Sequence, residues 1–420
     1  MTKLIISFSH SNYLKSSSGT ERSIRETYKI LWNENIHHLN IFPIRSLSIA
    51  HLNDKLIGVY TKKNLKNMII ELLLKYSYEL NCIHLQHLMN HNLVSLKSLL
   101  VELDVPIVLF LHDFYTICKS PHFMTHENKF CGITKPTNFK CEHCKYGVGG
   151  IEHYSRMRDF LLDIFPLVET VIAPSSFVIS SWINIFPVYE KKTVVRSHLL
   201  INFESKKLPI IKGKVRIAFV GSSQPLKGYE KWLELVNYLK EKSPQSYEFY
   251  NFGNNSDKVD GVQNVFVSIA SQGENAMIQS LKKYSIHCAL LWSLSPETYS
   301  YVYYELLTSG VFVLSNTMAG NVVSEVEKYN NGVIFSSFKE CISLVSKPNE
   351  LKSLINSFKG SESLKAIDFY PNSNTDSLFF FKETNKISTQ PTKNYLDFSN
   401  KILTFLYILR FKLKKLLNLN

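Results

Sequence analysis

The sequence predicts an α/β protein of two domains, each with a parallel sheet flanked by helices. Two observations support this prediction. Short apolar runs of strand length alternate with helical patterns through most of the chain, as expected for crossover units that join parallel strands. The chain also has 420 residues, which is enough for two domains with hydrophobic cores of their own.

The predicted strands form two series, which we assign to domains at 1–200 and 213–382. The polar stretch Ser197–Lys214 separates them and lacks strong periodicity, so we place an interdomain linker there. The strands of the first series are Leu4–Phe8, Cys82–Leu85, Ile107–Leu111, Thr170–Ala173 and Thr193–Arg196. Those of the second are Arg216–Val220, Tyr247–Phe252, Gln263–Val267, Ile286–Leu291, Val311–Ser315 and Gly332–Phe335. In such domains a ligand is expected at the carboxyl ends of the strands.

Composition and charge narrow the class of protein. Hydrophobic residues make up 45% and charged residues 20% of the chain, which is ordinary for a soluble globular protein. The net charge of +13 indicates an anionic partner such as a nucleotide, a lipid phosphate or a membrane surface. No basic arm carries base-reading aromatic residues, so nucleic acid is not an expected partner.

The sequence also indicates a compartment. No apolar run reaches the ~18 residues of a membrane-spanning helix. The first ten residues, Met1–His10, lack a signal-peptide core and read as a buried strand. Seven cysteines without a signal sequence indicate a reducing, cytoplasmic setting.

The most specific pattern lies in Ser295–Gly310, where Glu297 and Glu305 have seven residues between them. A proline near the start suits the first helical turn and a glycine suits the stop, so we expect a helix over Pro296–Ser309. That helix would separate the carboxylates by ~12 Å along its axis. Glu297 would lie at the N-terminus, where free N–H groups attract phosphate, and Glu305 would lie deeper, near a hydroxyl pair.

This segment resembles the Glu-x7-Glu signature of retaining GT-B glycosyltransferases of family 4. The resemblance implies two Rossmann-like domains facing across a cleft, with Glu297 in a catalytic role at the donor sugar and Glu305 on the nucleotide ribose. The glycine-rich start of the signature is replaced by Thr298, Tyr299, Ser300 and Tyr301, and we expect the first three of these beside the donor. Taken alone, the spacing also fits an amphipathic helix with two solvated glutamates, but its place between two apolar strands favours the signature.

Two further segments of the first domain resemble family motifs. Ser16–Ile24 is similar to the Gly-Gly-x-Glu-Arg loop, with Ser18 replacing one glycine and Gly19 allowing close approach of a ligand to the backbone. His112 follows a predicted strand, and the resemblance gives it a catalytic role at the donor sugar. Asp113 is expected to cap or orient its neighbours. A plain strand-to-helix turn and a structural histidine are the simpler alternatives.

The second domain opens with Arg216–Gly228, where the family carries basic residues for the donor diphosphate. Gly221 ends the strand, Ser222 stands where an arginine is expected, and Lys227 matches the family's lysine. Lys227 would stabilise the leaving phosphate, unless it is only a solvated surface charge. No metal-binding Asp-x-Asp motif is present, so no catalytic cofactor is expected.

Four cysteines lie in an insertion that we place at 118–150. Cys141 and Cys144 have the two-residue gap of a zinc knuckle, whereas Cys118 and Cys131 are twelve residues apart, which is not a standard spacing. A subgroup of family 4 enzymes shares this layout, which implies a structural zinc ion. Reduced, partly buried cysteines or a single disulfide are the alternatives. The spare candidate ligands are His122, His126 and His143.

Residues 383–420 read as a linker followed by a basic tail. Glu383–Lys393 is polar, and Ile402–Leu417 is apolar and basic without any acidic residue. This pattern favours an interfacial helix on anionic lipid at the inner face of the cell membrane. A helix packed on its own domain is the alternative.

These features predict a glycosyltransferase of the hexosyltransferase type that acts with retention. It would move a sugar from a nucleotide-sugar to a growing surface polysaccharide or lipid-linked glycan. Ser222 and the altered residues after Glu297 favour a second reading, a non-catalytic GT-B subunit or glycan-binding partner of an active enzyme. A third, a nucleotide-sugar epimerase, fits the tail and the cysteine insertion poorly.

Overall fold

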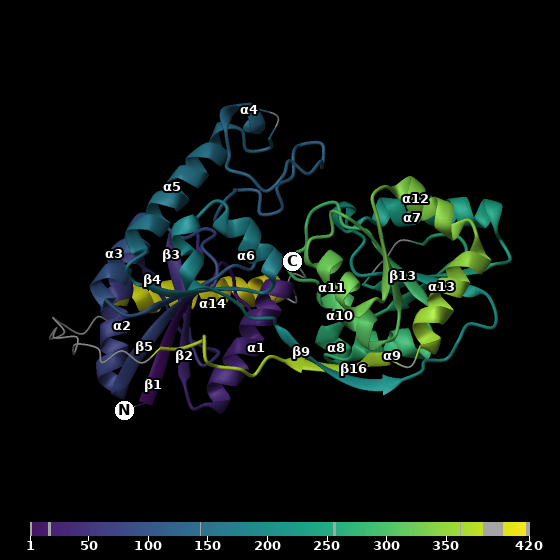
Figure 1. Ribbon diagram of the computed structural model, residues 1–420. Coiled ribbons are helices and arrows are strands. Elements are labelled where there is room, and N and C mark those ends of the chain that lie inside the picture. Colours follow the sequence, from purple (N-terminus) through teal and green to yellow (C-terminus); the bar gives the residue numbers. More distant parts are fainter. Residues whose placement is uncertain are drawn as a thin grey trace.

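The computed structural model describes residues 2–15, 18–142, 144–254, 258–361, 363–380 and 398–416. Two α/β domains lie side by side, each built around its own sheet (Figure 1). The predicted fold class is therefore confirmed, and all eleven predicted strands are present to within two residues at their ends, apart from the start of β5, which lies four residues before the predicted one.

The N-terminal sheet has eight strands in the order β4-β3-β2-β1-β5-β6-β7-β8. Their bounds are β1 Thr2–Phe8, β2 His37–Ile44, β3 Leu47–Leu52, β4 Lys55–Thr61, β5 Tyr78–Leu85, β6 Ile107–Phe110, β7 Val168–Ala173 and β8 Thr193–Val195. The prediction of a wholly parallel sheet is wrong at one edge, because β3 is antiparallel to both β2 and β4. The tight turn between β3 and β4 places Asn53 and Asp54 at positive φ, as hairpin turns require.

Helices cover both faces of this sheet. They are α1 Gly19–Asn33, α2 Lys62–Tyr76, α3 Leu93–Leu103, α4 Asn138–Cys141, α5 Val148–Ile164, α6 Ser176–Ile183 and the 3-10 turn η1 Pro187–Lys192. Alternation along β1 divides the core, since successive side chains of a strand point to opposite faces. Leu4, Ile6 and Phe8 pack with residues of α2, α3 and α5, whereas Ile5 packs on the face covered by α1.

The C-terminal sheet has six parallel strands in the order β12-β11-β10-β13-β14-β15. Their bounds are β10 Val215–Val220, β11 Tyr247–Gly253, β12 Val262–Phe266, β13 Cys288–Leu291, β14 Phe312–Asn316 and β15 Gly332–Phe335. The surrounding helices are η2 Pro225–Lys227, α7 Tyr229–Lys242, α8 Ile269–Gln272, α9 Ala276–Lys283, α10 Tyr301–Thr308, α11 Asn321–Tyr329, α12 Phe338–Val345 and α13 Pro348–Gly360. The strand order reverses between β10 and β13, which is where doubly wound sheets bind ligands.

The predicted linker at Ser197–Lys214 contains a strand, which its weak periodicity did not indicate. β9 (Leu199–Lys206) pairs antiparallel with β16 (Ser363–Pro371) along one side of the C-terminal domain (Figure 1). Asn202, Glu204 and Ser205 of β9 are exposed and polar, which hides its strand character in the sequence.

After β16 the chain returns to the N-terminal domain, although the predicted second domain runs to 382. The Arg196 side chain donates to the carbonyl oxygens of Asn372 and Asn374, at 2.5 and 3.1 Å. The Leu378 side chain is fully buried in the core beneath α1, and its carbonyl oxygen lies 2.5 Å from His84 Nε2.

The tail helix α14 (Phe398–Leu416) packs on the edge strand β4, so the alternative of a helix docked on its own domain is the one observed. Thr404 Oγ1 accepts a hydrogen bond of 3.0 Å from the backbone N–H of Val59. Leu403 and Tyr407 pack on an apolar cluster of β2, β3 and β4. The linker predicted at Glu383–Lys393 lies outside the described residues. In the part of the chain that the structure describes, no helix is long and apolar enough to cross a membrane.

Candidate active site

The candidate site lies where the strand ends of the two sheets meet. The segment between β13 and α10 forms its shared wall, because it bonds directly to the N-terminal domain. Thr298 Oγ1 donates to the carbonyl oxygen of His112 at 2.7 Å, and Ser175 Oγ donates to the carbonyl oxygen of Thr298 at 2.9 Å. Residues predicted from opposite halves of the chain are thus brought together.

The helix that carries the second glutamate begins at Tyr301, so the prediction of a start at Pro296 is wrong. Ser300 is the N-cap, and its hydroxyl accepts from the N–H of Tyr303. Glu297 instead lies in an extended stretch bridged to Gly320, whose φ is 63°. A Cβ at Gly320 would come within 2.4 Å of the Glu297 carbonyl oxygen, so only glycine fits. This contact holds Glu297 on a fixed loop ahead of the helix.

Lys227 and Glu297 form an ion pair, with 2.6 Å between Nζ and Oε1. Ser293 Oγ donates to the same carboxylate oxygen at 3.2 Å. The turn of Lys227 is fixed by Gly228, which has a φ of 75° and whose Cβ would lie 1.9 Å from the Trp292 carbonyl oxygen. The predicted phosphate lysine and the predicted sugar carboxylate therefore meet at the carboxyl ends of β10 and β13.

The glycines predicted beside the donor differ in their surroundings. Gly221 has a φ of 126°, and no described atom lies within 4 Å of where its Cβ would stand. Ser222 follows in the same turn and is exposed. Gly19 opens α1, and a Cβ there would meet the Tyr301 ring at 3.7 Å, an ordinary contact. Open space thus faces the C-terminal turn at Gly221.

Glu305 is only 3% exposed and lies opposite Arg22 of the N-terminal domain. Its Oε1 is 3.6 Å from Arg22 Nη1. Burial raises the pKa of Glu305 to about 7, although the Arg22 charge pulls in the other direction. The two residues predicted as an isolated pair of ligand carboxylates therefore have very different environments.

Arg22 links the two domains through several groups. It bonds Glu26 at 2.9 Å, reaches Glu274 at 3.3 Å and lies 4.2 Å from the centre of the Tyr301 ring. Within the described residues, its buried Nη1 has no hydrogen-bond partner. Arg22 is not among the predicted site residues, although it is the arginine of the Glu-Arg pair in the motif at Ser16–Ile24.

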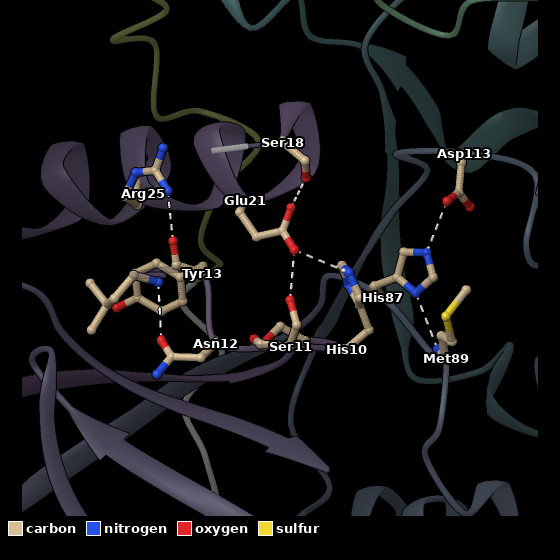
Figure 2. Close-up of polar contacts among 12 residues, drawn as sticks. His10, Ser11, Asn12, Tyr13, Ser18, Glu21, Arg25, His87, Met89 and Asp113 are labelled. Carbon is tan, nitrogen blue, oxygen red and sulfur yellow. Dashed lines mark hydrogen bonds and ion pairs between the residues drawn. The ribbon is translucent and has the colours of Figure 1, made fainter. Parts of the chain in front are cut away.

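A second polar cluster gathers at the carboxyl ends of β1 and β5 (Figure 2). Glu21 accepts from Ser11 Oγ at 2.6 Å and from Ser18 Oγ, and lies 3.2 Å from His10 Nε2. Burial opposes its ionisation, but the hydrogen bonds from His10 and Ser11 lower its pKa to about 2. The contact of Ser18 with Glu21 has the local Ser-x-x-Glu spacing at the start of a helix, whereas those of His10 and Ser11 depend on the fold of the loop after β1.

The same view shows Asp113 fixed by His87 (Figure 2). The His87 Nε2 lies 3.0 Å from Asp113 Oδ2, while its Nδ1 accepts from the N–H of Met89. The other carboxylate oxygen of Asp113 accepts from the N–H of Tyr115 at 2.8 Å, so of its two predicted roles Asp113 orients its neighbours. Burial disfavours the Asp113 carboxylate, yet the charge and hydrogen bond of His87 bring its pKa to about 2.

His112 lies beside this cluster and is 8% exposed. Its Nε2 is 2.8 Å from Gln86 Oε1. Burial, together with the neighbouring His87, lowers the pKa of His112 to about 3. The ring is therefore neutral near pH 7, so it can hydrogen-bond a substrate but cannot deliver a proton as an imidazolium.

The three residues after Glu297 use their side chains within the protein. Thr298 bonds His112, and Ser300 caps α10. The Tyr299 hydroxyl accepts from the N–H of Leu199 and lies 3.1 Å from Ser197 Oγ. If Thr298, Tyr299 and Ser300 lie beside the donor as predicted, the groups left to contact it are the backbone N–H groups of this segment.

The four cysteines of the insertion carry free thiols, so the disulfide alternative is not observed. Burial raises the pKa of Cys118 to about 12, and the charges of Cys144, Cys131 and Cys141 act in the same direction. Within the described residues, no group of three or more His, Cys, Asp or Glu side chains is placed to hold a metal ion. His143 lies outside the described residues.

The fold is that of the GT-B glycosyltransferases, as comparison with solved structures shows. WaaG, a glycosyltransferase involved in lipopolysaccharide biosynthesis, has a TM-score of 0.52 at 12% identity, with 84% of this chain and 93% of that chain covered. A glycosyltransferase from Rickettsia africae has a TM-score of 0.53 at 12% identity, covering 85% and 91%. The lipopolysaccharide outer core galactosyltransferase WaaB has a TM-score of 0.50 at 11% identity, covering 85% and 94%. No family model and no curated protein matches the sequence.

Proposed function

We propose that this protein is a retaining glycosyltransferase that transfers a sugar from a nucleotide-sugar to a surface polysaccharide or lipid-linked glycan. One observation carries the proposal. The two glutamates of the Glu-x7-Glu segment follow β13, one of the two strands at the strand-order reversal, and one glutamate is paired with Lys227 and the other with Arg22. Ligands of doubly wound sheets bind at that reversal.

The geometry assigns a role to each charged group. The donor diphosphate lies beside Lys227 and the open turn at Gly221. It replaces Glu297 as the ion-pair partner of Lys227. Glu297 is then free to accept from hydroxyls of the sugar, and Glu305 accepts from the ribose. The bond from the sugar to the diphosphate breaks as the acceptor oxygen bonds to the same face. The acceptor proton passes to the leaving phosphate, whose charge Lys227 stabilises.

A screen of nucleotide-sugars tests this function. Purified protein should bind one donor saturably by calorimetry and hydrolyse it slowly without acceptor, and the released anomer should have the donor's configuration. Glu305→Ala should lose this binding, whereas Glu327→Ala, on an exposed residue of α11, should keep it. If no nucleotide-sugar binds, the proposal fails.

The non-catalytic reading has one observation in its favour. Ser222, in the position of the family's arginine, is exposed and supplies no positive charge to the phosphate side of the site. Donor binding without hydrolysis or transfer, with the true acceptor present, would support that reading.

We also place the protein in the cytoplasm, peripheral on the inner membrane face. The side of α14 away from β4 exposes Phe405, Leu406 and Leu409 next to exposed Lys401 and Arg410. Apolar and basic side chains together favour anionic lipid. Phe405→Ser/Leu409→Ser should reduce sedimentation with phosphatidylglycerol vesicles while sparing the Leu403 and Tyr407 contacts. Unchanged sedimentation would exclude this surface.

A structural zinc ion is a further proposal. Cys118, Cys131, Cys141 and Cys144 lie in one insertion with free thiols, and the Tyr146 N–H donates to the Cys144 sulfur at 3.5 Å, which suits a thiolate. Elemental analysis of protein purified without chelator should find one zinc per chain, and Cys141→Ser/Cys144→Ser should lose it. Metal-free protein with reduced thiols and a protease-resistant insertion would exclude the ion.

A further inference from the structure

A groove of 450 Å³ lies in the N-terminal domain, apart from the candidate site, between the carboxyl ends of β1 and β2 and the helices α2 and α3. Its floor is apolar and includes Phe8, Leu65, Leu96 and Leu99. Its rim is basic and includes Arg45, Lys62, Lys63 and Lys66. We call this the basic-rimmed groove. Its volume falls within the range of small-molecule sites.

Most of the positive charge on the rim is not paired with an acidic side chain of the described residues. Lys66 is paired with Glu102, which is the one acidic residue lining the groove. Arg45, Lys62 and Lys63 are exposed, and no ion pair is found for them among the residues that the structure describes. Three free cations above an apolar floor fit a ligand with an anionic head and an apolar chain, since phosphate pairs well with Arg and Lys.

One end of the groove lies near the polar cluster around Glu21. Phe8 lines the groove at the end of β1, and His10, two residues further on, belongs to the cluster around Glu21. His91 separates the two, because its Nε2 lies 2.8 Å from the Ser9 carbonyl oxygen and its ring packs on Phe8. The part of a ligand that extends from the groove past His91 is therefore directed toward the strand ends where transfer is proposed.

The other side of the groove adjoins the tail helix. Leu47 lines the groove and also belongs to the apolar cluster on which Leu403 and Tyr407 of α14 pack. The opposite side of α14 exposes Phe405, Leu406 and Leu409. The groove thus lies between the edge on which α14 packs and the end of β1.

We propose that the basic-rimmed groove binds the phosphate and first chain segment of a lipid-linked acceptor, with the phosphate between Arg45, Lys62 and Lys63. The apolar chain lies over Phe8 and Leu99 and leaves toward α14. The groove's role in acceptor binding rests on the proposed function, whereas its affinity for a lipid phosphate does not.

The test measures binding of a prenyl phosphate in non-ionic detergent, with the same-chain prenol and inorganic phosphate as comparison probes. Prenyl phosphate should bind saturably, and Lys62→Glu/Lys63→Glu should bind it about 10- to 30-fold more weakly. Lys212→Glu/Lys339→Glu, with the same charge change on exposed residues outside the N-terminal sheet, should bind it like the parent. Ser98→Trp, which fills the groove without changing charge, should also weaken binding.

Several outcomes would overturn the proposal. One is equal weakening by both charge-reversal pairs, which would mean that only net charge matters. Another is unchanged binding in Ser98→Trp. A third is competition by inorganic phosphate or prenol at the concentration of the prenyl phosphate, because the site would then recognise only the phosphate or only the apolar chain. Lipid binding in a protein that accepts no nucleotide-sugar would retain the groove and reject the proposed function.

Discussion

The two glutamates of one short segment meet opposite environments. The Glu297 side chain is 15% exposed, and its partner Lys227 is 42% exposed. The Glu305 side chain is 4% exposed, and its partner Arg22 is 5% exposed. A ligand can displace the first pair with water nearby to solvate the lysine. Breaking the second leaves charges buried between the domains, so we infer that it holds the domains together as well as facing the donor.

The largest effect on stability is expected when Arg22 is replaced. Arg22→Met leaves Glu26 and Glu305 buried without their cation, and we expect it to lower the free energy of unfolding by about 3–5 kcal/mol. Arg22→Lys, which keeps the charge but loses the fork, should cost less. Denaturant unfolding measures both. A methionine variant as stable as the parent would show that this pair does not hold the domains.

The pH dependence of stability sharpens the same contrast. Burial raises the pKa of Glu305 from its ordinary value of 4.5 to about 7 in the folded protein. Because it is raised, its contribution is fully present below pH 4.5 and is lost as the pH rises through about 7, by on the order of 3 kcal/mol. Glu305→Gln does not titrate, so it should gain stability relative to the parent across that window. Parallel stability curves would contradict the raised pKa.

Donor binding is the next test. Glu305→Ala should weaken binding of the nucleotide-sugar by about 1.5–3 kcal/mol, because charge-assisted hydrogen bonds to the ribose are lost. Parent affinity should also rise with pH through about 7, since the ionised carboxylate is the better acceptor. Calorimetry on the folded variant measures both, and unchanged donor affinity would remove Glu305 from the site.

The smallest effect on stability is expected at the exposed pair. Lys227→Ala and Glu297→Gln should change the free energy of unfolding by only about 0–1 kcal/mol. Their effects should appear in function: Lys227→Ala weakens binding of diphosphates but not of the nucleoside, and Glu297→Gln lowers turnover more than donor affinity. A nucleoside bound equally weakly would make the lysine structural.

Local patterns predicted the sheets, and contacts between distant residues decided the rest. Each predicted strand is a short apolar run, which is why all eleven are present. The start of α10 follows Ser300 and not Pro296, because Glu297 is bridged to Gly320 across 23 positions of sequence. Asn53 and Asp54 are turn-forming residues at positive φ, so the sequence does carry a local signal for the hairpin of β3 and β4.

The candidate site divides in the same way. Lys227, Glu297 and Glu305 are recognisable from motif spacing, and the structure brings the first two into contact. The partnership of Arg22 with Glu305 joins residues of different domains, and nothing local in the sequence indicates it. The docking of α14 likewise depends on an unpaired edge at Val59, which becomes visible only once the strand order is known.

The return of the chain to its first half has a consequence for synthesis. Leu378 completes the core beneath α1, and Thr404 bonds the edge at Val59. A ribosome adds about 5–20 residues per second, so residues 1–200 wait roughly 10–40 s for Leu378 to be made. During that interval the place that Leu378 takes beside Ile5 and Phe110 is open, although α1 already covers this face of the sheet. The nascent N-terminal half is therefore a natural client for a chaperone that shields apolar strands at the tunnel exit.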